Sequence, residues 1–155
     1  MTTKAEQVFD AVVAAVAAVL TSAVRIPNPL ELEATPGVIL QNGYGVSVGP
    51  AGDPDDESLP ILAYTREFGV TLTRLVAATD SDAAAMATTQ KQLLADMHAV
   101  AKKLLYTSAT LGSICNVLGF DGDTGVEQLA TLDGTGRYFV LSAVFRVRYA
   151  ENVST

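Results

Sequence analysis

The sequence predicts an α+β fold, a two-layer domain in which a four-stranded antiparallel or mixed sheet carries two main helices on one face. Two segments show the apolar repeat of amphipathic helices, and four read as strands. Their order is helix, strand, strand, helix, strand, strand. Each helix must bury one face, and packing both on one side of the sheet is the compact solution. No linker or repeat divides residues 1–155, so we expect a single domain.

Residues 5–22 are predicted to form the first helix. Valines recur on one side of this segment at steps of three and four residues, namely Val8, Val12, Val16 and Val19. Pro27 and Pro29 cannot continue a helix and therefore end it. The apolar run 11–20 is too short for a bilayer, which needs about 20 residues. Glu6 and Asp10 precede this run, whereas a signal peptide begins with basic residues. We therefore expect no membrane segment, and we expect synthesis in a cytoplasm.

Residues 37–48 and 62–76 are predicted strands, joined by the turn-rich segment 49–58 into an antiparallel hairpin. Gly43 and Gly45 share one face of the first strand, where they permit a bulge or a close backbone approach. The connecting segment is strongly acidic, and its carboxylates are Asp53, Asp55, Asp56 and Glu57. Such a segment is typical of a solvated hairpin tip.

The second half of the chain repeats the order of helix and two strands. Residues 81–106 are a predicted helix, because 79–82 offer capping side chains and an apolar stripe follows. We expect residues 111–123 to be irregular and 126–132 to form a strand. A tight turn at 133–136 leads to residues 137–149, in which six residues from Phe139 to Tyr149 share one face.

Four arginines on the long predicted strands are candidates for a subunit interface. They are Arg66, Arg74, Arg146 and Arg148, of which the first two share a strand face with Phe68, Val70 and Leu72. We expect arginines opposite the helix-covered face to point to solvent or to another subunit. Val140 and Val144 share a face with the last two arginines, and mixed apolar and arginine surface is typical of interface cores. Solubilisation and protection of a sheet edge explain the same pattern equally well.

Motifs for catalysis or cofactor binding fail at named positions. Val48 stands where a dinucleotide motif that starts at Gly43 needs its third glycine, and Val126 stands at the glycine position of a calcium loop that starts at Asp121. His98 has no metal-ligand spacing around it, and Cys115 fits a small buried residue. We therefore expect no enzyme, no catalytic residue, no cofactor and no metal.

The acidic balance also limits the partners. The formal net charge is −7, so binding DNA through its phosphates is disfavoured. Charged residues make up only 17% of the chain and apolar residues 49%, which suggests that partners cover some of its apolar surface.

The element order, the acidic segment and the closing strand 137–149 together resemble the tail terminator proteins of tailed bacteriophages and the related neck and tail-completion proteins. The resemblance implies a virion protein that forms a homohexameric ring at the end of the tail tube. Such a ring stops tube polymerisation and joins the tail to the neck or head. DNA passes through its lumen, and the four carboxylates of the acidic segment would face the lumen or a partner without gripping phosphates.

Two alternatives remain open on the sequence alone. Another head–tail connector, neck or tail tube subunit would share the layout and composition. A small ligand-binding domain would need a pocket with convergent polar groups, for which the sequence offers only His98 and Cys115 as reactive side chains.

Overall fold

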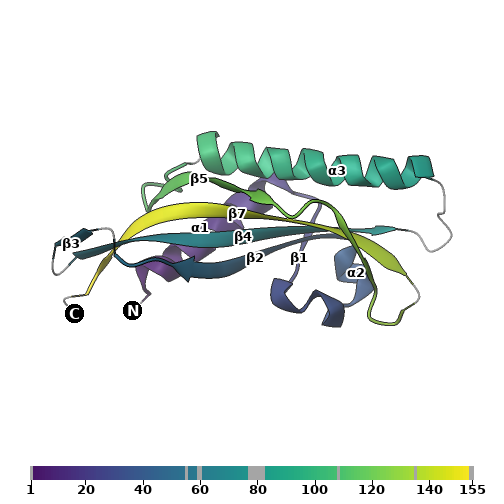
Figure 1. The fold of residues 1–155 in the computed structure, drawn as a ribbon, viewed down its shortest axis with the longest axis horizontal. Helices are drawn as coiled ribbons and strands as arrows, with labels where there is room; N and C mark the ends of the chain where they lie inside the picture. The colour runs from purple at the N-terminus through teal and green to yellow at the C-terminus, as the bar shows by residue number, and fades with distance from the viewer. Residues whose placement is uncertain are drawn as a thin grey trace.

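A computed structural model describes residues 2–54, 56–58, 61–76, 83–107, 109–134 and 136–153 (Figure 1). Its elements in chain order are α1 (Lys4–Val19), β1 (Val24–Arg25), the 3-10 segment η1 (Pro29–Ala34), α2 (Gly37–Leu40), β2 (Asn42–Ala51), β3 (Asp56–Ser58), β4 (Ile61–Val76), α3 (Ala83–Lys102), the π-helical segment η2 (Lys103–Thr107), β5 (Asn116–Asp123), β6 (Glu127–Ala130) and β7 (Arg137–Asn152). The predicted α+β class is confirmed. The capping segment predicted at 79–82 lies outside the described residues.

The strands of the described residues form one mixed sheet. Its order is β1-β2-β4-β7-β5, with β3 paired to the start of β4 and β6 paired to the start of β7. β1 runs parallel to β2, and the other pairs are antiparallel. The two central strands, β4 and β7, pair without interruption from Ile61↔Asn152 to Val76↔Arg137. The prediction of four strands is therefore wrong in number, since seven form, but the predicted long strands are its centre.

The main core lies between the sheet and the two helices α1 and α3, which cover the same face. Its apolar side chains come from alternate positions of β4 and β7, including Phe68, Val70, Leu141 and Phe145. The helices contribute their predicted stripes, which are Val8, Val12 and Val16 from α1 and Leu93, Met97 and Val100 from α3. The predicted packing of both helices on one face is confirmed.

The opposite face carries a feature that the sequence analysis missed. Residues 28–40, here called the lobe, comprise η1 and α2 and cover one end of this face (Figure 1). A second, smaller core of Ile26, Leu40, Tyr138 and Val140 lies beneath them. The prediction that the first strand begins at Gly37 is wrong, because 37–40 form a helical turn that buries Leu40 and β2 begins at Asn42.

Glycines in β2 allow the lobe to lie directly on the sheet. A Cβ on Gly45 would be 2.7 Å from the Cβ of Pro29, and one on Gly43 would be 2.9 Å from the carbonyl oxygen of Ile39. Only glycine permits such a close approach of two backbones. The close approach predicted for these two glycines is confirmed.

The segment 116–123, predicted to be irregular, is the edge strand β5. It pairs with β7, and its register shifts twice, between Val117 and Gly119 and between Phe120 and Asp123. These irregularities break the two-residue alternation on which strand prediction depends. The prediction is therefore wrong because the strand is bulged.

The two ends of the chain meet at the N-terminus of α1. Thr3 and Glu6 form a capping box there, in which the Thr3 hydroxyl accepts from the Glu6 amide. The Glu151 carboxylate, from the end of β7, accepts from the amides of Lys4 at 2.7 Å and Ala5 at 3.3 Å. A carboxylate at this position also complements the helix dipole. This contact fixes α1 to the central strand.

Candidate interaction surfaces

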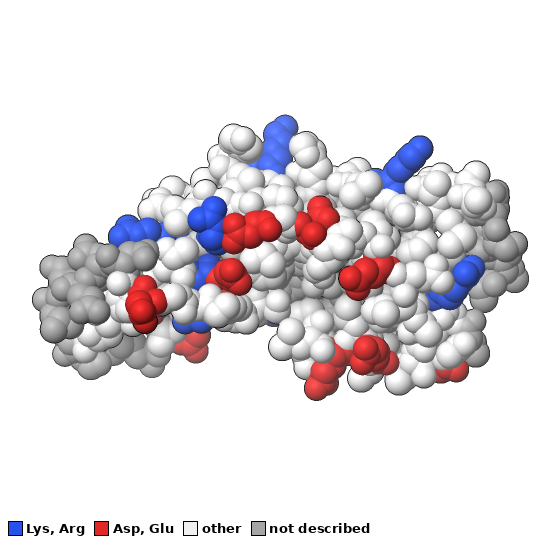
Figure 2. Space-filling model, in the orientation of Figure 1, with Lys and Arg blue, Asp and Glu red and all other residues white. Residues whose placement is uncertain are grey.

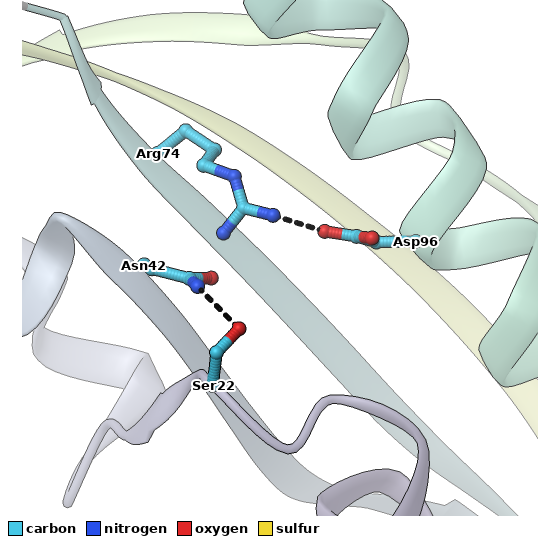
Figure 3. Close-up of polar contacts among 4 residues, drawn as sticks. All are labelled: Ser22, Asn42, Arg74 and Asp96. Atoms are coloured by element: carbon cyan, nitrogen blue, oxygen red, sulfur yellow. Dashed lines mark hydrogen bonds and ion pairs between the residues drawn. The ribbon is translucent and has the colours of Figure 1, made fainter.

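Arg66 and Arg74 lie on the helix-covered face of β4. They share this face with Phe68, Val70 and Leu72, as strand alternation predicts, so neither residue points away from the helices. Arg74 forms an ion pair with Asp96 of α3, which lies across from it in Figure 3. Arg66 donates through Nε to the Tyr149 hydroxyl at 2.9 Å and through Nη1 to the Gly49 carbonyl oxygen at 3.0 Å. Both side chains thus have partners within their own chain.

The ion pair fixes α3 to the C-terminal end of β4. Asn42, the register partner of Arg74 in β2, donates to the Ser22 hydroxyl at 3.4 Å (Figure 3). The side chains of Arg74 and Asp96 retain 18% and 29% exposure, so the pair is shielded from solvent without being fully buried. Its role at a subunit interface stays a prediction.

Arg146, Arg148 and Val144 lie on the opposite face of the sheet, as predicted for arginines that point away from the helices. The Arg146 Nε donates to the Asp121 carboxylate at 2.7 Å. Glu67 and Thr65 are the register partners of these two arginines in β4. Figure 2 shows charged side chains of both signs on the half of this face that the lobe leaves open. We call this half the open face.

Small polar side chains continue the open face toward the lobe. The hydroxyls of Thr71 and Ser142, which are register partners, form a hydrogen bond at 3.0 Å. Gly69 lies opposite Val144 and leaves room for the Ser47 hydroxyl. This part of the open face therefore consists of small side chains, next to the charged residues described above.

Val140 shares its face with Val144, but the lobe covers it. Its side chain is 5% exposed and belongs to the second core, beside Tyr138. The hydroxyls of Tyr138 and Thr73 are buried in the same region without a hydrogen-bond partner among the described residues. Burial also raises the pKa of Tyr138 above its usual value, with a further contribution from Glu33 of the lobe. A contact between Val140 and another subunit stays a prediction, and it would require the lobe to move.

The predicted acidic segment is partly strand. β2 extends to Ala51, and 56–58 pair with the start of β4, so the two strands enclose a shorter loop than expected. Asp53 is exposed in this loop. Asp55 lies outside the described residues, as do the side chains of Asp56 and Glu57. Their predicted position facing a lumen or partner stays a prediction.

A shallow groove runs between the start of α1 and the end of β2. Its volume is about 660 Å³, and it is lined by Ala5, Phe9, Val48 and Arg66 with Glu6 and Asp10 on the α1 side. Arg66, at this groove, is held by Tyr149 and Gly49. The groove therefore combines an apolar floor with one cation whose position is fixed.

The side chains considered for chemistry do not converge. Cys115 is buried, and desolvation raises the pKa of its thiol from 9.0 to about 11. A thiol with a raised pKa is a poor nucleophile at neutral pH. His98 is on the exposed side of α3. Among the described residues, no group of three or more His, Cys, Asp or Glu side chains could hold a metal ion.

Two surfaces with large exposed apolar side chains escaped the sequence analysis. In the lobe, Leu30 is 79% exposed and Val38 is 70% exposed. On α3 and η2, Leu94 is 52% exposed and Tyr106 is 82% exposed. The signal in the sequence was the pattern Leu-Glu-Leu-Glu at 30–33, whose alternation resembles a strand, although Asn28 caps a 3-10 segment there. Exposed apolar residues that lie close together are candidates for contact surfaces.

Comparison with known proteins places few limits on the chain. The sequence matches no family model, and no curated protein matches it. Among solved structures, a chain of the virion of a native gene transfer agent particle is similar over 91% of this chain and 92% of that chain. The two share 17% sequence identity, with a TM-score of 0.35. That score is too low to assign a common fold or a common role. Separately, no helix of the described residues is long and apolar enough to cross a membrane.

Proposed function

We propose that this chain is a structural subunit of a phage-like particle, and specifically a tail terminator. In this role six copies form a ring at the end of the tail tube. The ring stops tube polymerisation and joins the tail to the neck or head, and DNA passes through its lumen. The proposal assigns the chain an assembly role rather than catalysis.

One structural observation carries the proposal. The paired strands β4 and β7 form a ribbon of 16 residues each, about 50 Å long at the usual rise per residue. Within the described residues, the chain leaves half of one face of this ribbon open, and β5 has a strand partner on one side alone. A rigid ribbon with an open face and an unpaired edge is suited to contacts between neighbouring subunits.

The charge of the chain supports passage of DNA rather than binding. A net charge of −7 repels phosphates, and the open face pairs Arg146 with Asp121 within the chain. A ring lumen should not retain the duplex that moves through it. The resemblance of the sequence layout to tail terminators is the second support.

Imaging of particles that carry a tagged copy of this chain would test the role. A tail terminator should appear as one ring at the end of the tail that meets the neck, whereas a tube subunit should repeat along the tail. A head–tail connector should appear at the vertex of the head. Absence of the tag from every particle position would contradict the whole proposal.

The ligand-binding alternative rests on the groove beside Phe9 and Val48. His98 and Cys115, the reactive side chains that the sequence offers, do not line this groove. Replacement of both by alanine should leave assembly and infectivity unchanged, because Cys115 is a core residue and His98 is on a helix surface. Loss of function without loss of folding would favour the alternative.

A further inference from the structure

Two elements on opposite faces of the sheet, α3 and the lobe, carry exposed side chains of opposite charge. α3 lies on one face of the sheet, and the lobe lies on the other face at the β1–β2 edge (Figure 1). Figure 2, in the same orientation, shows Lys and Arg side chains projecting over α3 and Asp and Glu side chains gathered over the lobe. The separation places a basic and an acidic surface on opposite sides of one chain.

The basic surface is a stripe along the outer side of α3. Three of the four lysines of the chain lie in α3 and η2, and the carboxylate of Asp96 in this segment is paired with Arg74. The exposed stripe runs at helical spacing and consists of Lys91, Leu94, His98 and Lys102, followed by Tyr106 in η2. We call these five residues the basic stripe. It combines two lysines with two exposed apolar side chains, Leu94 and Tyr106.

The acidic surface is the outer side of the lobe. Its charged residues, Glu31 and Glu33, are both acidic and exposed. Leu30 and Val38 are exposed in the same segment, while Leu40 fixes it to the second core. Like the basic stripe, the lobe presents charge beside apolar area, but the charge has the opposite sign.

We propose that the lobe of one copy binds the basic stripe of the next copy. Glu31 and Glu33 would face Lys91 and Lys102, while Leu30 and Val38 would cover Leu94 and Tyr106. Complementary charge would select this pairing and orient it, and burial of the four apolar side chains would stabilise it. This inference rests on the proposed function, and it names the contact through which the ring forms.

The position of the two surfaces explains why the contact would be heterologous. A patch that meets a different patch on the neighbour links copies head to tail, and the chain of copies either closes into a ring or grows into a filament. A self-complementary pair would instead stop at two copies. The opposite placement of lobe and stripe on the molecule suits the first arrangement.

Charge reversal provides the test. The variants K91E/K102E and E31K/E33K each place like charges on both sides of every lobe–stripe contact. Each variant alone should therefore self-associate more weakly, with a Kd at least about tenfold higher than that of the wild type. A 1:1 mixture should recover it, because the two variants can alternate around a ring with an even number of copies. Recovery also shows that both variants fold. The double variant D10K/E127K reverses two exposed carboxylates outside the lobe and the acidic segment, and it should associate like the wild type.

Zero-length carbodiimide cross-linking tests the contact directly in the wild-type protein. In a 1:1 mixture of ¹⁴N- and ¹⁵N-labelled chains, about half of the peptides that join Glu31 or Glu33 to Lys91 or Lys102 should contain one label of each kind, as random pairing of separate copies requires. The variant Y106S should reduce their yield without affecting folding, since Tyr106 is largely exposed.

Failure of this inference differs from failure of the proposed function. If the wild type self-associates but both charge-reversed variants do so equally well, or no mixed-label cross-link forms at these residues, the lobe–stripe contact is wrong and the ring proposal stands. A wild type that stays monomeric at the highest attainable concentration overturns both.

Discussion

At the scale of single residues, two ion pairs of similar chemistry differ in their surroundings. Arg74 and Asp96 join β4 to α3 between two layers of the core, and both side chains are largely shielded. Arg146 and Asp121 lie on the open face, where their side chains are 43% and 35% exposed. Shielding strengthens the attraction between charges, and it makes the loss of one partner more costly.

The variant D96A should lower the free energy of unfolding by about 1–3 kcal/mol, because it leaves Arg74 shielded from solvent without its carboxylate partner. The matched variant D121A should lower it by less than about 1 kcal/mol, as is usual for exposed pairs. Urea denaturation at neutral pH measures both. Equal effects of the two variants would contradict the account of the Arg74 contact.

Two tyrosines provide a second contrast. The Tyr149 hydroxyl accepts a hydrogen bond from Arg66, whereas the buried Tyr138 hydroxyl has no hydrogen-bond partner in the part of the chain that the structure describes. Y149F should therefore destabilise the fold by about 1–2 kcal/mol, and Y138F should be neutral or stabilising. Thermal unfolding followed by circular dichroism compares them. A clear loss of stability in Y138F would show that a buried water or another group satisfies its hydroxyl.

At the scale of elements, α1 depends on a contact from the other end of the chain. The Glu151 carboxylate accepts from two backbone amides in the first turn of α1. Amides in the first turn have no carbonyl partner within the helix, so the carboxylate satisfies them. E151A should lower the free energy of unfolding by about 1–2 kcal/mol, and E151Q by less, because the amide oxygen still accepts. The exposed Glu127 serves as the control, and E127A should change stability by less than about 0.5 kcal/mol. A cost for E151A no larger than that for E127A would contradict the contact.

The lobe depends on the absence of a side chain at Gly45. G45A places a Cβ 2.7 Å from that of Pro29, so the lobe must shift, and we expect a loss of about 1–3 kcal/mol. Gly52 has open space around it, so G52A should change stability by less than about 0.5 kcal/mol. Hydrogen exchange should locate the effect of G45A in 28–40. Unchanged protection there would mean that the lobe is not held as described.

The same elements show which parts of the fold could be predicted from the sequence. α1, α3, β4 and β7 have long, regular apolar repeats, and the structure forms them close to the predicted bounds. β5 was missed because its bulges disrupt alternation, and the lobe was missed because short 3-10 and α turns have no periodicity to detect. Alternation along β4 puts Arg66 and Arg74 on the face of Phe68, but their partners, Tyr149 and Asp96, are distant in the sequence and no local pattern specifies them.

For the candidate surfaces too, local alternation predicted some features, and contacts distant in the sequence determined the others. Strand alternation alone predicts that three residues face away from the helices, namely Val144, Arg146 and Arg148, and the structure agrees. The burial of Val140 depends on the lobe and could not be anticipated without it. The charge separation between lobe and basic stripe appears only when the fold places 30–38 and 91–106 on opposite sides of the sheet.

At the scale of the whole molecule, the chain combines a rigid sheet with contact surfaces on opposite sides. The central claim is that this arrangement serves assembly with further copies of the same chain. Association driven partly by charge should weaken as salt rises, because ions screen exposed charges over about 8–10 Å at 0.1–0.15 M. A chain that recognises another protein through these surfaces, and not itself, would lack this concentration-dependent behaviour when purified.

The most direct measurement is the mass of the purified wild-type chain in solution, by light scattering after size exclusion and by native mass spectrometry, over a wide range of protein concentration and salt. The account predicts a closed particle of six chains, or a monomer that converts to it as concentration rises and salt falls. A chain that remains monomeric at the highest concentration and lowest salt would contradict the account.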